Sequence, residues 1–384
     1  MHICFISPSY PGKHNQVDFA FVKQLVDAIA DQGHSCYVLS PFNITHYKRF
    51  ARRTEEYNVG GGIVSVYRPP YLSFSTFHIG RFNPSRQSHN RALRKAFSML
   101  PVQPDVIYGH FWNSAYEGAE YAKLNGIPLF VATGESTIHE ERMTEESRKV
   151  FRDYIAGVIC VSSKNRDESI AKGLTTIEKC IVLPNAVNTD LFKKRDRRYC
   201  REQLGFPRED FIIAFVGWFN ERKGACRVSE AINRIGGVKS IFIGKGNQEP
   251  HCDGILFKGA VSHDEVPLYL GAADCFVLPT LAEGCCNAVI EAMACGLPII
   301  SSNLPFNWDV LDDTNSIMIN PNSIEEIANA IHTLRDNPEL RVKLAEGAAS
   351  RATALTIENR AKAIIEFMES KTKHAAKKED YCSV

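Results

Sequence analysis

The stretch that decides the fold is LPTLAEGCCNAVIEAMACGLPII, residues 278–300. The short apolar run that ends at Pro279 predicts a buried parallel strand. A helix is expected directly after the loop, because Asn287 can serve as N-cap, Gly296 suits the left-handed position behind the last turn, and Pro298 prevents continuation. The stretch therefore predicts a strand, a loop of small residues and a short helix.

Two carboxylates frame this loop, Glu283 inside it and Glu291 one turn into the helix. The first main-chain N–H groups of a helix lack intrahelical partners and attract phosphate. Here they belong to Gly284, Cys285, Cys286, Asn287 and Ala288. Carboxylates beside a phosphate would repel it unless their oxygens face hydroxyl groups, as those of a sugar and a ribose allow. The pattern indicates a nucleotide-sugar site with Glu283 on the sugar and Glu291 on the ribose. The alternative is a solvated loop residue and an exposed helix residue.

Four segments carry a family resemblance, namely EGCCNAVIEAMACGLPII (283–300), VGWFNERKG (216–224), IGKGNQEPH (243–251) and LPNAVNTDLF (183–192). They resemble the signature regions of the family 4 glycosyltransferases, and the resemblance spans most of residues 100–330. It implies the α/β GT-B fold, with two Rossmann-like, doubly wound parallel-sheet domains facing a central cleft. It also implies retention at the anomeric carbon, with a nucleoside-diphosphate sugar as co-substrate and neither metal nor cofactor.

Short β-rich runs alternate with helical stretches along the chain, which predicts parallel βα units. The first half has such runs at residues 3–6, 36–39, 63–66, 106–108, 129–132, 158–161 and 181–183. The second half has them at 212–216, 241–243, 255–257, 275–278, 297–300 and 317–319. Two doubly wound domains follow.

A chain of 384 residues is too long for one hydrophobic core and suits two. We expect an N-terminal acceptor-binding domain over residues 1–190 and a C-terminal nucleotide-sugar-binding domain over 191–355, with the ligands in the cleft between them. The boundary falls in a strongly charged stretch, residues 188–200. The resemblance implies that a helix over 356–372 packs back on the first domain, and residues 373–384 are expected to form a flexible tail.

Composition excludes several classes of protein. Lys and Arg total 45 against 44 Asp and Glu, so the net charge of +1 indicates no nucleic-acid partner. The twelve cysteines show no C-x-x-C spacing and are interpreted as reduced thiols. No run of 18 apolar residues occurs, and the apolar run at the N-terminus is too short for a signal peptide, so a cytoplasmic location is expected.

Lys223 is the expected cation at the leaving group, because it follows a predicted strand and precedes a turn into the next helix. A fixed positive charge there stabilises the departing diphosphate more than the ground state. The alternative is a solvated lysine in a turn. The resemblance implies an Arg where this chain has Trp218, so Arg222 is expected to supply a second phosphate contact. Gly217 and Gly244 are expected to let the backbone approach the donor.

In the first domain, Gly12 follows the first strand and is expected to line the donor side, with Lys13, His14, Asn15 and Gln16 behind it. The resemblance implies a His after the fifth strand, at the position where this chain has Glu135. Glu135 is therefore a candidate base for the acceptor hydroxyl, with His110 and His139 as rivals. His110 is also a candidate acceptor contact. Each of these residues could equally be a loop residue without a catalytic role.

Residues 46–95 are strongly basic, with ten Lys or Arg against two Glu, a net charge of +8. Their last part continues into a helical pattern, residues 86–100, with Leu93, Ala96, Phe97 and Leu100 on one face and Arg91, Arg94 and Lys95 beside it. This pattern predicts either a surface-seeking helix that binds anionic lipid headgroups or an ordinary amphipathic helix on its own sheet. Our hypothesis is a peripheral enzyme on the inner face of the membrane.

The sequence thus predicts a metal-independent retaining transferase that moves a hexose or N-acetylhexosamine from a nucleoside-diphosphate sugar, with UDP favoured. The acceptor is a hydroxyl of a lipid-linked or cell-surface polysaccharide precursor. The residues expected to act in catalysis are Glu283, Lys223, Arg222 and Glu135. Two alternatives remain open, a nucleotide-sugar epimerase of the same architecture and a non-catalytic sugar-nucleotide-binding protein.

Overall fold

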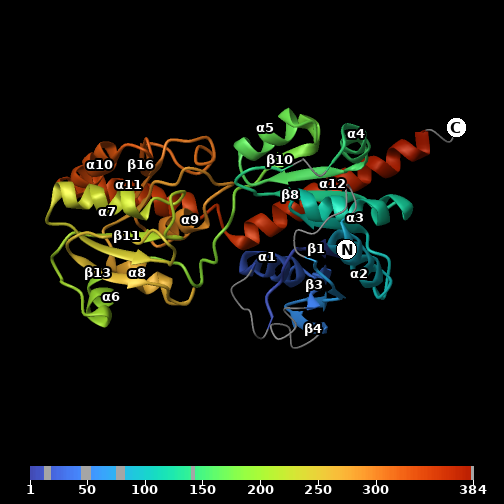
Figure 1. Cartoon of the computed structure of the whole chain (residues 1–384), viewed down its shortest axis with the longest axis horizontal. Helices are drawn as coiled ribbons and strands as arrows, with labels where there is room; N and C mark the ends of the chain where they lie inside the picture. The colour runs from blue at the N-terminus through green and yellow to red at the C-terminus, as the bar shows by residue number, and fades with distance from the viewer. Residues whose placement is uncertain (13–18, 45–52, 75–82, 140–142, 382–384) are drawn as a thin grey trace. The chain divides into compact units, whose positions relative to one another are not determined.

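The computed structural model describes residues 1–12, 19–44, 53–74, 83–139 and 143–381, with side chains to residue 372. The chain forms two compact units (Figure 1). Unit 1 comprises Met1–Val161, Asn165–Leu183 and Ile357–Val384, and unit 2 comprises Ser162–Lys164 and Pro184–Thr356. The chain passes from unit 1 to unit 2 at Leu183 and Pro184, a few residues before the boundary expected at 190.

Unit 1 is built on an eight-stranded sheet of order β10-β9-β8-β7-β1-β2-β5-β4. Its strands are β1 (His2–Ile6), β2 (Ser35–Leu39), β4 (Thr54–Val59), β5 (Gly62–Tyr67), β7 (Val106–His110), β8 (Leu129–Thr133), β9 (Gly157–Cys160) and β10 (Cys180–Val182). All pair in parallel except β4, which is antiparallel to β5. A two-stranded pair, β3 (Phe42–Asn43) and β6 (Pro70–Tyr71), accompanies the sheet.

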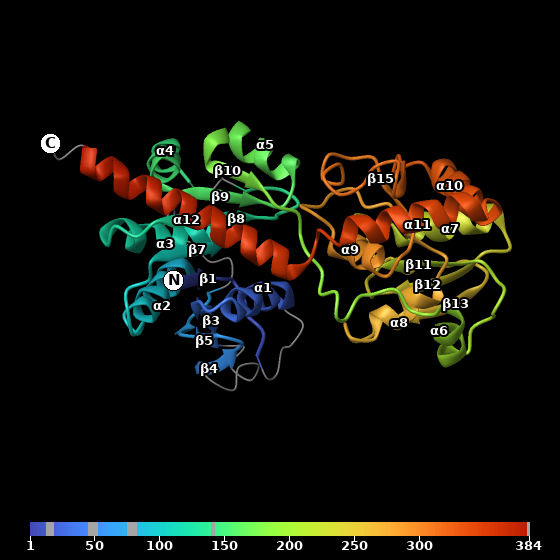
Figure 2. The ribbon, with the colours of Figure 1, turned by 180° about the vertical axis from the view of Figure 1, so that it is seen from behind.

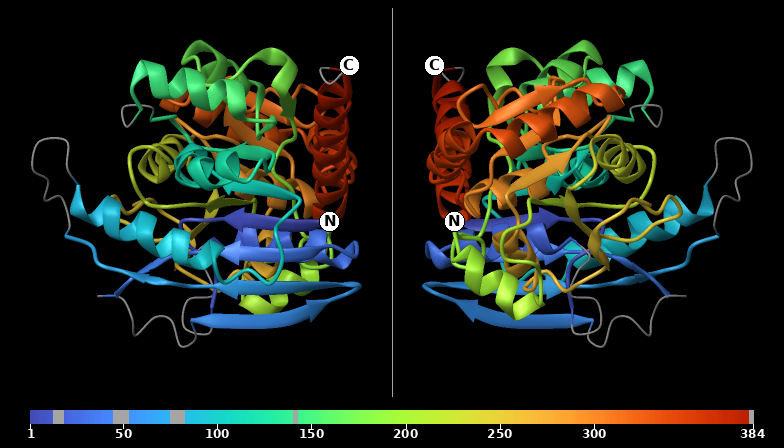
Figure 3. Two further views of the ribbon diagram at one scale, coloured as in Figure 1. Left: turned by 90° about the vertical axis from the view of Figure 1, so that its right-hand side faces the viewer. Right: turned by 90° about the vertical axis from the view of Figure 1, so that its left-hand side faces the viewer.

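Helices cover both faces of this sheet (Figure 3). Alternate residues of β1 point to opposite faces, so Ile3 and Phe5 join one core cluster while Cys4 and Ile6 join the other. The first cluster is completed by α1 (Ala20–Asp31) and α12 (Ile357–Tyr381), which pack against each other (Figure 2). The second is completed by α2 (Pro84–Phe97), α3 (Trp112–Leu124) and α4 (Glu145–Tyr154), while α5 (Ser163–Ala171) and a 3₁₀ turn (Ile177–Lys179) precede β10.

Unit 2 contains a six-stranded, all-parallel sheet of order β13-β12-β11-β14-β15-β16. The strands are β11 (Ile212–Val216), β12 (Lys239–Ile243), β13 (Ile255–Gly259), β14 (Cys275–Leu278), β15 (Ile299–Ser302) and β16 (Ser316–Ile319). The strand order reverses between β11 and β14, so the topological switch point lies at the loops that follow these two strands in the sequence. In open α/β sheets, ligands bind beside the carboxyl ends of the strands at such a point.

The helices of unit 2 are α6 (Arg197–Leu204), α7 (Ala225–Ile235), α8 (Val266–Ala272), α9 (Asn287–Ala294), α10 (Ile324–Asp336) and α11 (Pro338–Ala352). The predicted helix after residue 287 is confirmed, and Gly296 adopts the left-handed conformation (φ +76°). The predicted N-cap was wrong. Cys286 is the N-cap and Asn287 the first helical residue.

Two further expectations are corrected by the structure. The edge strand β4 was not predicted, because its sequence, TEEYNV, is largely polar. A polar sequence is possible there because the residues of β4 are exposed or half-buried. Helix α12 continues to Tyr381, whereas residues from 373 onward were expected to form a tail. The segment is rich in Ala, Lys and Glu, which are strong helix formers. Residues 382–384 lie outside the described part of the chain.

Candidate functional site

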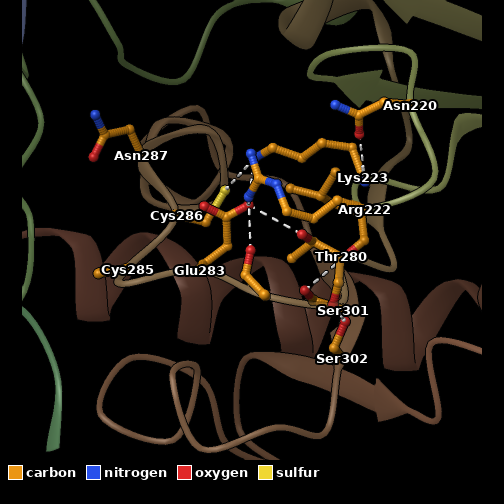
Figure 4. A network of polar contacts seen from close by, with 12 residues as sticks. Asn220, Arg222, Lys223, Thr280, Glu283, Cys285, Cys286, Asn287, Ser301 and Ser302 are labelled. Atoms are coloured by element: carbon orange, nitrogen blue, oxygen red, sulfur yellow. Dashed lines mark hydrogen bonds and ion pairs between the residues drawn. The ribbon is translucent and has the colours of Figure 1, made fainter. Parts of the chain in front are cut away.

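The carboxylate of Glu283 lies at the switch point of unit 2 and gathers two cations (Figure 4). Its Oε1 accepts hydrogen bonds from Arg222 Nη1 at 2.5 Å and from the Thr280 hydroxyl at 3.0 Å, and lies 2.6 Å from Lys223 Nζ. Glu283 and Lys223 are largely buried, whereas the Arg222 side chain is 38% exposed. The predicted site residues in the loops that follow β11 and β14, namely Arg222, Lys223 and Glu283, are therefore in direct contact.

Main-chain contacts hold the two loops of this site together. The Leu281 N–H donates to the Arg222 carbonyl oxygen at 2.8 Å, and Arg222 Nη1 donates to the Ala282 carbonyl oxygen at 2.6 Å. Lys223 is fixed from its own side, since its N–H donates to Asn220 Oδ1 at 3.0 Å. Gly224 has a φ of +82°, which few other residues adopt easily, and it lets the chain turn directly into α7.

Electrostatics keep Lys223 charged. Burial works to lower the pKa of this ammonium, but the Cys286 sulfur in its thiolate form and the Glu283 carboxylate raise it, and the net result is a raised pKa. Burial also raises the pKa of the Cys286 thiol, so the sulfur, 3.8 Å from Lys223 Nζ, is neutral at neutral pH. The two basic side chains and one carboxylate leave the cluster with one net positive charge, which suits an anionic ligand.

The start of α9 supplies main-chain donors beside this cluster. The N–H groups of Gly284, Cys286 and Asn287 donate no hydrogen bond to any residue that the structure describes. The Asn287 side chain does not cap the helix but accepts a hydrogen bond from Asn185 Nδ2 at 2.7 Å, and the same Nδ2 reaches the Cys285 carbonyl oxygen at 3.0 Å. The loop is thereby held with donors available for an anion.

Glu291 lies inside α9 and contacts His263, with 3.0 Å between Oε1 and Nε2. The hydrogen bond to Glu291 outweighs burial and raises the pKa of His263. The His263 ring also lies against Phe192, with 5.0 Å between the ring centroids. His263 was not singled out from the sequence, so this side-chain partner of Glu291 was missed.

One of the glycines predicted at the site, Gly244, has a steric reason to be glycine. A Cβ on Gly244 would come within 1.9 Å of the Gly217 carbonyl oxygen, because β11 and β12 run side by side at this point. The Gly217 N–H completes the contact by donating to the Ile243 carbonyl oxygen at 2.9 Å. Gly244 thus allows close packing of the two strand ends, whereas a Cβ on Gly217 would make only ordinary contact, 3.4 Å from the Lys223 side chain.

Trp218, which stands where the resemblance implies Arg, is exposed. The Lys245 ammonium lies 5.5 Å from the centre of its ring. A cation is therefore present beside the position where the resemblance implied Arg. Sequence reasoning missed Lys245, and the pairing of β11 with β12, which sets Phe219 N–H against the Lys245 carbonyl oxygen at 2.9 Å, is the signal that could have found it.

In unit 1, Glu135 has a different environment. Its carboxylate accepts hydrogen bonds from the Trp112 N–H at 2.9 Å, the Gly134 N–H at 2.9 Å and the Thr133 hydroxyl at 2.7 Å. Trp112 is the first residue of α3, so Glu135 caps that helix from another loop. Burial raises the pKa of Glu135, although these donors oppose it. The geometry assigns Glu135 a role in holding the loop and gives no support to its prediction as a base.

His110 ends β7 and lies among the rings of Phe19, Phe21 and Phe111. Burial, with the Arg360 charge adding to it, lowers the pKa of His110 to about 3, so the ring is neutral. Its Nδ1 is buried without a hydrogen-bond partner among the described residues. Phe19 and Phe111 have φ values of 58° and 72°, an unfavourable conformation for bulky residues that is often associated with functional sites. His139, the other rival, is exposed.

The loop after β1 is held by a buried arginine. Arg68 Nη2 donates to the Pro11 carbonyl oxygen at 2.7 Å, and its Nη1 lies 3.0 Å from Glu55. Gly12 lies against the same guanidinium. Arg68, which sequence reasoning counted in the basic surface segment, therefore has an internal role. Residues 13–16, predicted to follow Gly12 at the donor site, lie outside the described residues.

The basic helix α2 packs on its own sheet, which is the ordinary one of the two alternatives. Ala92, Leu93, Ala96 and Phe97 are buried, and the Phe97 ring stacks on Tyr121 at 3.8 Å between centroids. The prediction of a surface-seeking apolar face was therefore wrong, because that face belongs to the core of unit 1. The basic residues lie on the outer side, where Arg91, Arg94 and Lys95 are exposed and Arg94 pairs with Glu120 at 2.7 Å.

Two features are absent from the part of the chain that the structure describes. Within the described ranges, no three His, Cys, Asp or Glu side chains form a group that could hold a metal ion. No helix in the same ranges has the length and apolar character needed to cross a bilayer.

Solved structures with the same architecture define the class. Sucrose-phosphate synthase from Thermosynechococcus elongatus superimposes with a TM-score of 0.76 at 19% identity, covering 96% of this chain and 98% of that one. Anabaena HepE in complex with UDP and glucose gives a TM-score of 0.69 at 18% identity, covering 96% of this chain and 100% of that one. The fold is the GT-B fold of glycosyltransferases.

Comparisons of sequence identify the family. The family described as Glycosyltransferase Family 4 matches residues 20–191, and that described as Glycosyl transferases group 1 matches residues 196–351. The Bacillus subtilis glycosyltransferase TuaC, whose name refers to teichuronic acid biosynthesis, is 27% identical over 352 residues, 86% of this chain and 88% of TuaC. A D-inositol 3-phosphate glycosyltransferase from Acidothermus cellulolyticus is 24% identical over 71% of this chain and 68% of its own length. The chain belongs to the family 4 glycosyltransferases.

Proposed function

We propose that this glycosyltransferase moves a hexose or N-acetylhexosamine from a UDP-sugar to a hydroxyl of a lipid-linked or cell-surface polysaccharide precursor, with retention at the anomeric carbon. The observation that carries the proposal is the cluster at the switch point of unit 2. There Lys223 and Arg222 converge on Glu283, beside the N–H groups of Gly284, Cys286 and Asn287, which donate to no described residue.

The cations and the helix start are suited to the diphosphate. When the glycosidic bond breaks, the bonding electron pair stays on the phosphate oxygen, and negative charge builds there. A buried ammonium held in place by Glu283, on a residue whose main-chain N–H is fixed by Asn220, stabilises this charge without having to reorganise. Because it acts on charge that develops only in the transition state, Lys223 is expected to affect turnover more than donor binding.

Glu283 and Glu291 are proposed to face hydroxyl groups. The Glu283 carboxylate makes its hydrogen bonds and its shortest ion-pair contacts through Oε1, so Oε2 has no hydrogen bond from a described residue. That oxygen is the one proposed to accept a sugar hydroxyl. Glu291, oriented by His263, is proposed to accept from the ribose hydroxyls.

The donor and the acceptor are supported by different relatives. HepE has been solved with UDP-glucose as well as with UDP, which supports a UDP-sugar donor. The match to TuaC covers more of this chain than the match to the D-inositol 3-phosphate glycosyltransferase. The name of TuaC refers to the biosynthesis of teichuronic acid. We therefore favour a polysaccharide precursor as acceptor.

Attachment to a membrane surface is proposed to be electrostatic rather than insertive. The side chains of Arg91 and Lys95 are exposed on α2 and make no hydrogen bond or ion pair with a described residue, while the apolar face of that helix is buried. Each such cation near an anionic surface contributes about 1 kcal/mol, an attraction that salt screens.

The test begins with the donor. In a thermal-shift panel of UDP-, GDP- and ADP-sugars we expect one UDP-sugar to stabilise the protein, by about 2.7 kcal/mol at 100 times its dissociation constant. With that donor and a lipid fraction as acceptor, UDP release should depend on the acceptor. Lys223→Gln should lower turnover about 10²- to 10³-fold at similar donor affinity.

Arg234→Gln is the matched control, because it removes one cation from the exposed surface of α7, where Glu230 is its only ion-pair partner among the described residues. Its turnover should equal that of the wild type. Isomerised donor formed without acceptor would show an epimerase instead, and donor binding without any release of UDP would show a non-catalytic binding protein. Either result would overturn the proposal.

A further inference from the structure

A second charged pocket lies in unit 2 at the amino-terminal ends of the strands, whereas the candidate site lies at their carboxyl ends. It is bounded by Asp274 and Pro298, which immediately precede β14 and β15, whereas Glu283 follows β14. The pocket has a volume of about 580 Å³, which lies within the range of small-molecule sites. Its basic residues are Lys194, Arg195, Arg197 and Arg341. The first three belong to the charged stretch that the sequence suggested only as a domain boundary.

The carboxylates of this pocket are already engaged. Asp274 forms ion pairs with Arg197 and with the buried Arg201, and it also accepts a hydrogen bond from the Ile212 N–H at 2.8 Å. Asp196 caps α6 by accepting from the Tyr199 N–H at 2.7 Å. Two cations therefore balance Asp274, and neither acid neutralises the remaining basic residues.

Three cations of the pocket have no carboxylate partner among the described residues. Lys194 and Arg195 make no hydrogen bond or ion pair with any residue in the described ranges. Arg341 donates to the carbonyl oxygens of Leu334 and Arg335 at 2.6 and 3.2 Å, contacts that leave its charge uncompensated. A concave site with this excess of positive charge attracts a polyvalent anion.

The basic segment is packed in place rather than extended into solvent. The aliphatic stem of Lys194 lies against Gly296, and the Cβ of Arg195 lies close to Gly271 at the end of α8. Helices α6 and α8, which contribute Arg197 and Gly271 to the pocket, pack side by side (Figure 1). Leu297, Pro298 and Val342 add an apolar wall, so the pocket can also contact the organic part of a charged ligand.

We propose that this pocket binds the phosphate or diphosphate group of a phosphorylated molecule, separately from the donor site. Phosphate fits these cations because arginine offers paired donors and lysine a compact charge. The ligand can come from a soluble phosphate compound or from a phospholipid headgroup, and the two sources share this chemistry. The proposal does not depend on the identity of the transferred sugar.

The experiment measures binding of inorganic diphosphate to the full chain by calorimetry at about 0.1 M salt. Lys194→Gln combined with Arg195→Gln should weaken this binding at least tenfold. Lys193→Gln combined with Arg198→Gln is the matched control, because these exposed neighbours remove the same charge from the same segment but do not line the pocket. The control should bind within about twofold of the wild type. Lys223→Gln should also retain this binding, because its own effect lies at the donor site.

Vesicles of phosphatidylglycerol form the second arm. Binding of soluble diphosphate that depends on Lys194 and Arg195 identifies a soluble ligand. Vesicle binding with the same dependence, and no binding of soluble diphosphate, identifies the headgroup. Equal losses in the two double variants would show that only overall charge matters and would overturn the proposal. Absence of both kinds of binding in the wild type, or a loss of diphosphate binding confined to Lys223→Gln, would overturn it as well.

Discussion

Two buried carboxylates, Glu283 in unit 2 and Glu135 in unit 1, were both predicted to take part in catalysis, and their partners separate them. Glu135 is held by two main-chain N–H groups and a hydroxyl, none of which can change its charge or move far. Glu283 is held by the side chains of Lys223 and Arg222, which can redistribute when an anion arrives. The kind of partner, more than burial, distinguishes a loop anchor from a candidate catalytic group.

The largest effect is expected when the Glu283 charge is removed. Glu283→Gln leaves the buried Lys223 without its counter-charge, and breaking a buried pair typically costs about 3–5 kcal/mol. We expect a loss near the lower end, because Arg222 is partly exposed, together with a fall in turnover of at least about 100-fold. Urea unfolding and UDP-release assays measure the two effects.

Glu221→Gln provides the control for that substitution. Glu221 lies in the same loop region and pairs with Arg227, but its side chain is 70% exposed. Its loss should change stability by less than about 1 kcal/mol. If Glu283→Gln behaved like Glu221→Gln in both assays, the contrast between the two carboxylates would disappear.

A smaller effect is expected at Glu135. In Glu135→Gln an amide NH₂ group replaces one carboxylate oxygen and faces hydrogen-bond donors, such as the Thr133 hydroxyl and the Gly134 N–H. This should cost about 1–2 kcal/mol of stability. Turnover of the folded protein should stay within about threefold of the wild type, because no reacting group is removed. Turnover reduced a hundredfold at an unchanged melting temperature would instead make Glu135 a catalytic residue.

The smallest effect concerns His263 and its dependence on pH. The hydrogen bond to Glu291 raises the pKa of His263 in the folded protein, so the stabilisation is complete below the ordinary histidine pKa and is lost as pH rises through the raised value. His263→Gln should therefore lower Tm by about 1–2 °C at about pH 5.5, and by less at about pH 8.5, since the ring is partly exposed. A Tm deficit that grew with pH would contradict the assignment.

The sequence predicted the strands of both sheets because each central strand is an apolar run with a turn behind it. It could not predict β4, whose residues are largely polar. It also placed the N-cap of α9 one residue too late, because Cys286 adopts the extended cap conformation and the Asn287 side chain bonds to Asn185 instead. It placed Lys223 and Glu283 on ligand-facing loops but gave no sign that they contact each other. That contact arises from the parallel pairing of β11 with β14, which joins loops far apart in the sequence.

Helix α12 has a consequence for biosynthesis. Ala361, Ile364, Ile365 and Met368 complete the core cluster that also contains Ile3 and Phe5, yet they leave the ribosome after all of unit 2. During translation, unit 1 must therefore wait with one apolar sheet face covered by α1 but not yet by α12, while unit 2, whose core lies within one late stretch of chain, folds first. The usual order, in which the amino-terminal half matures ahead of the rest, is reversed, and a nascent chain stalled before α12 exposes a surface for chaperones.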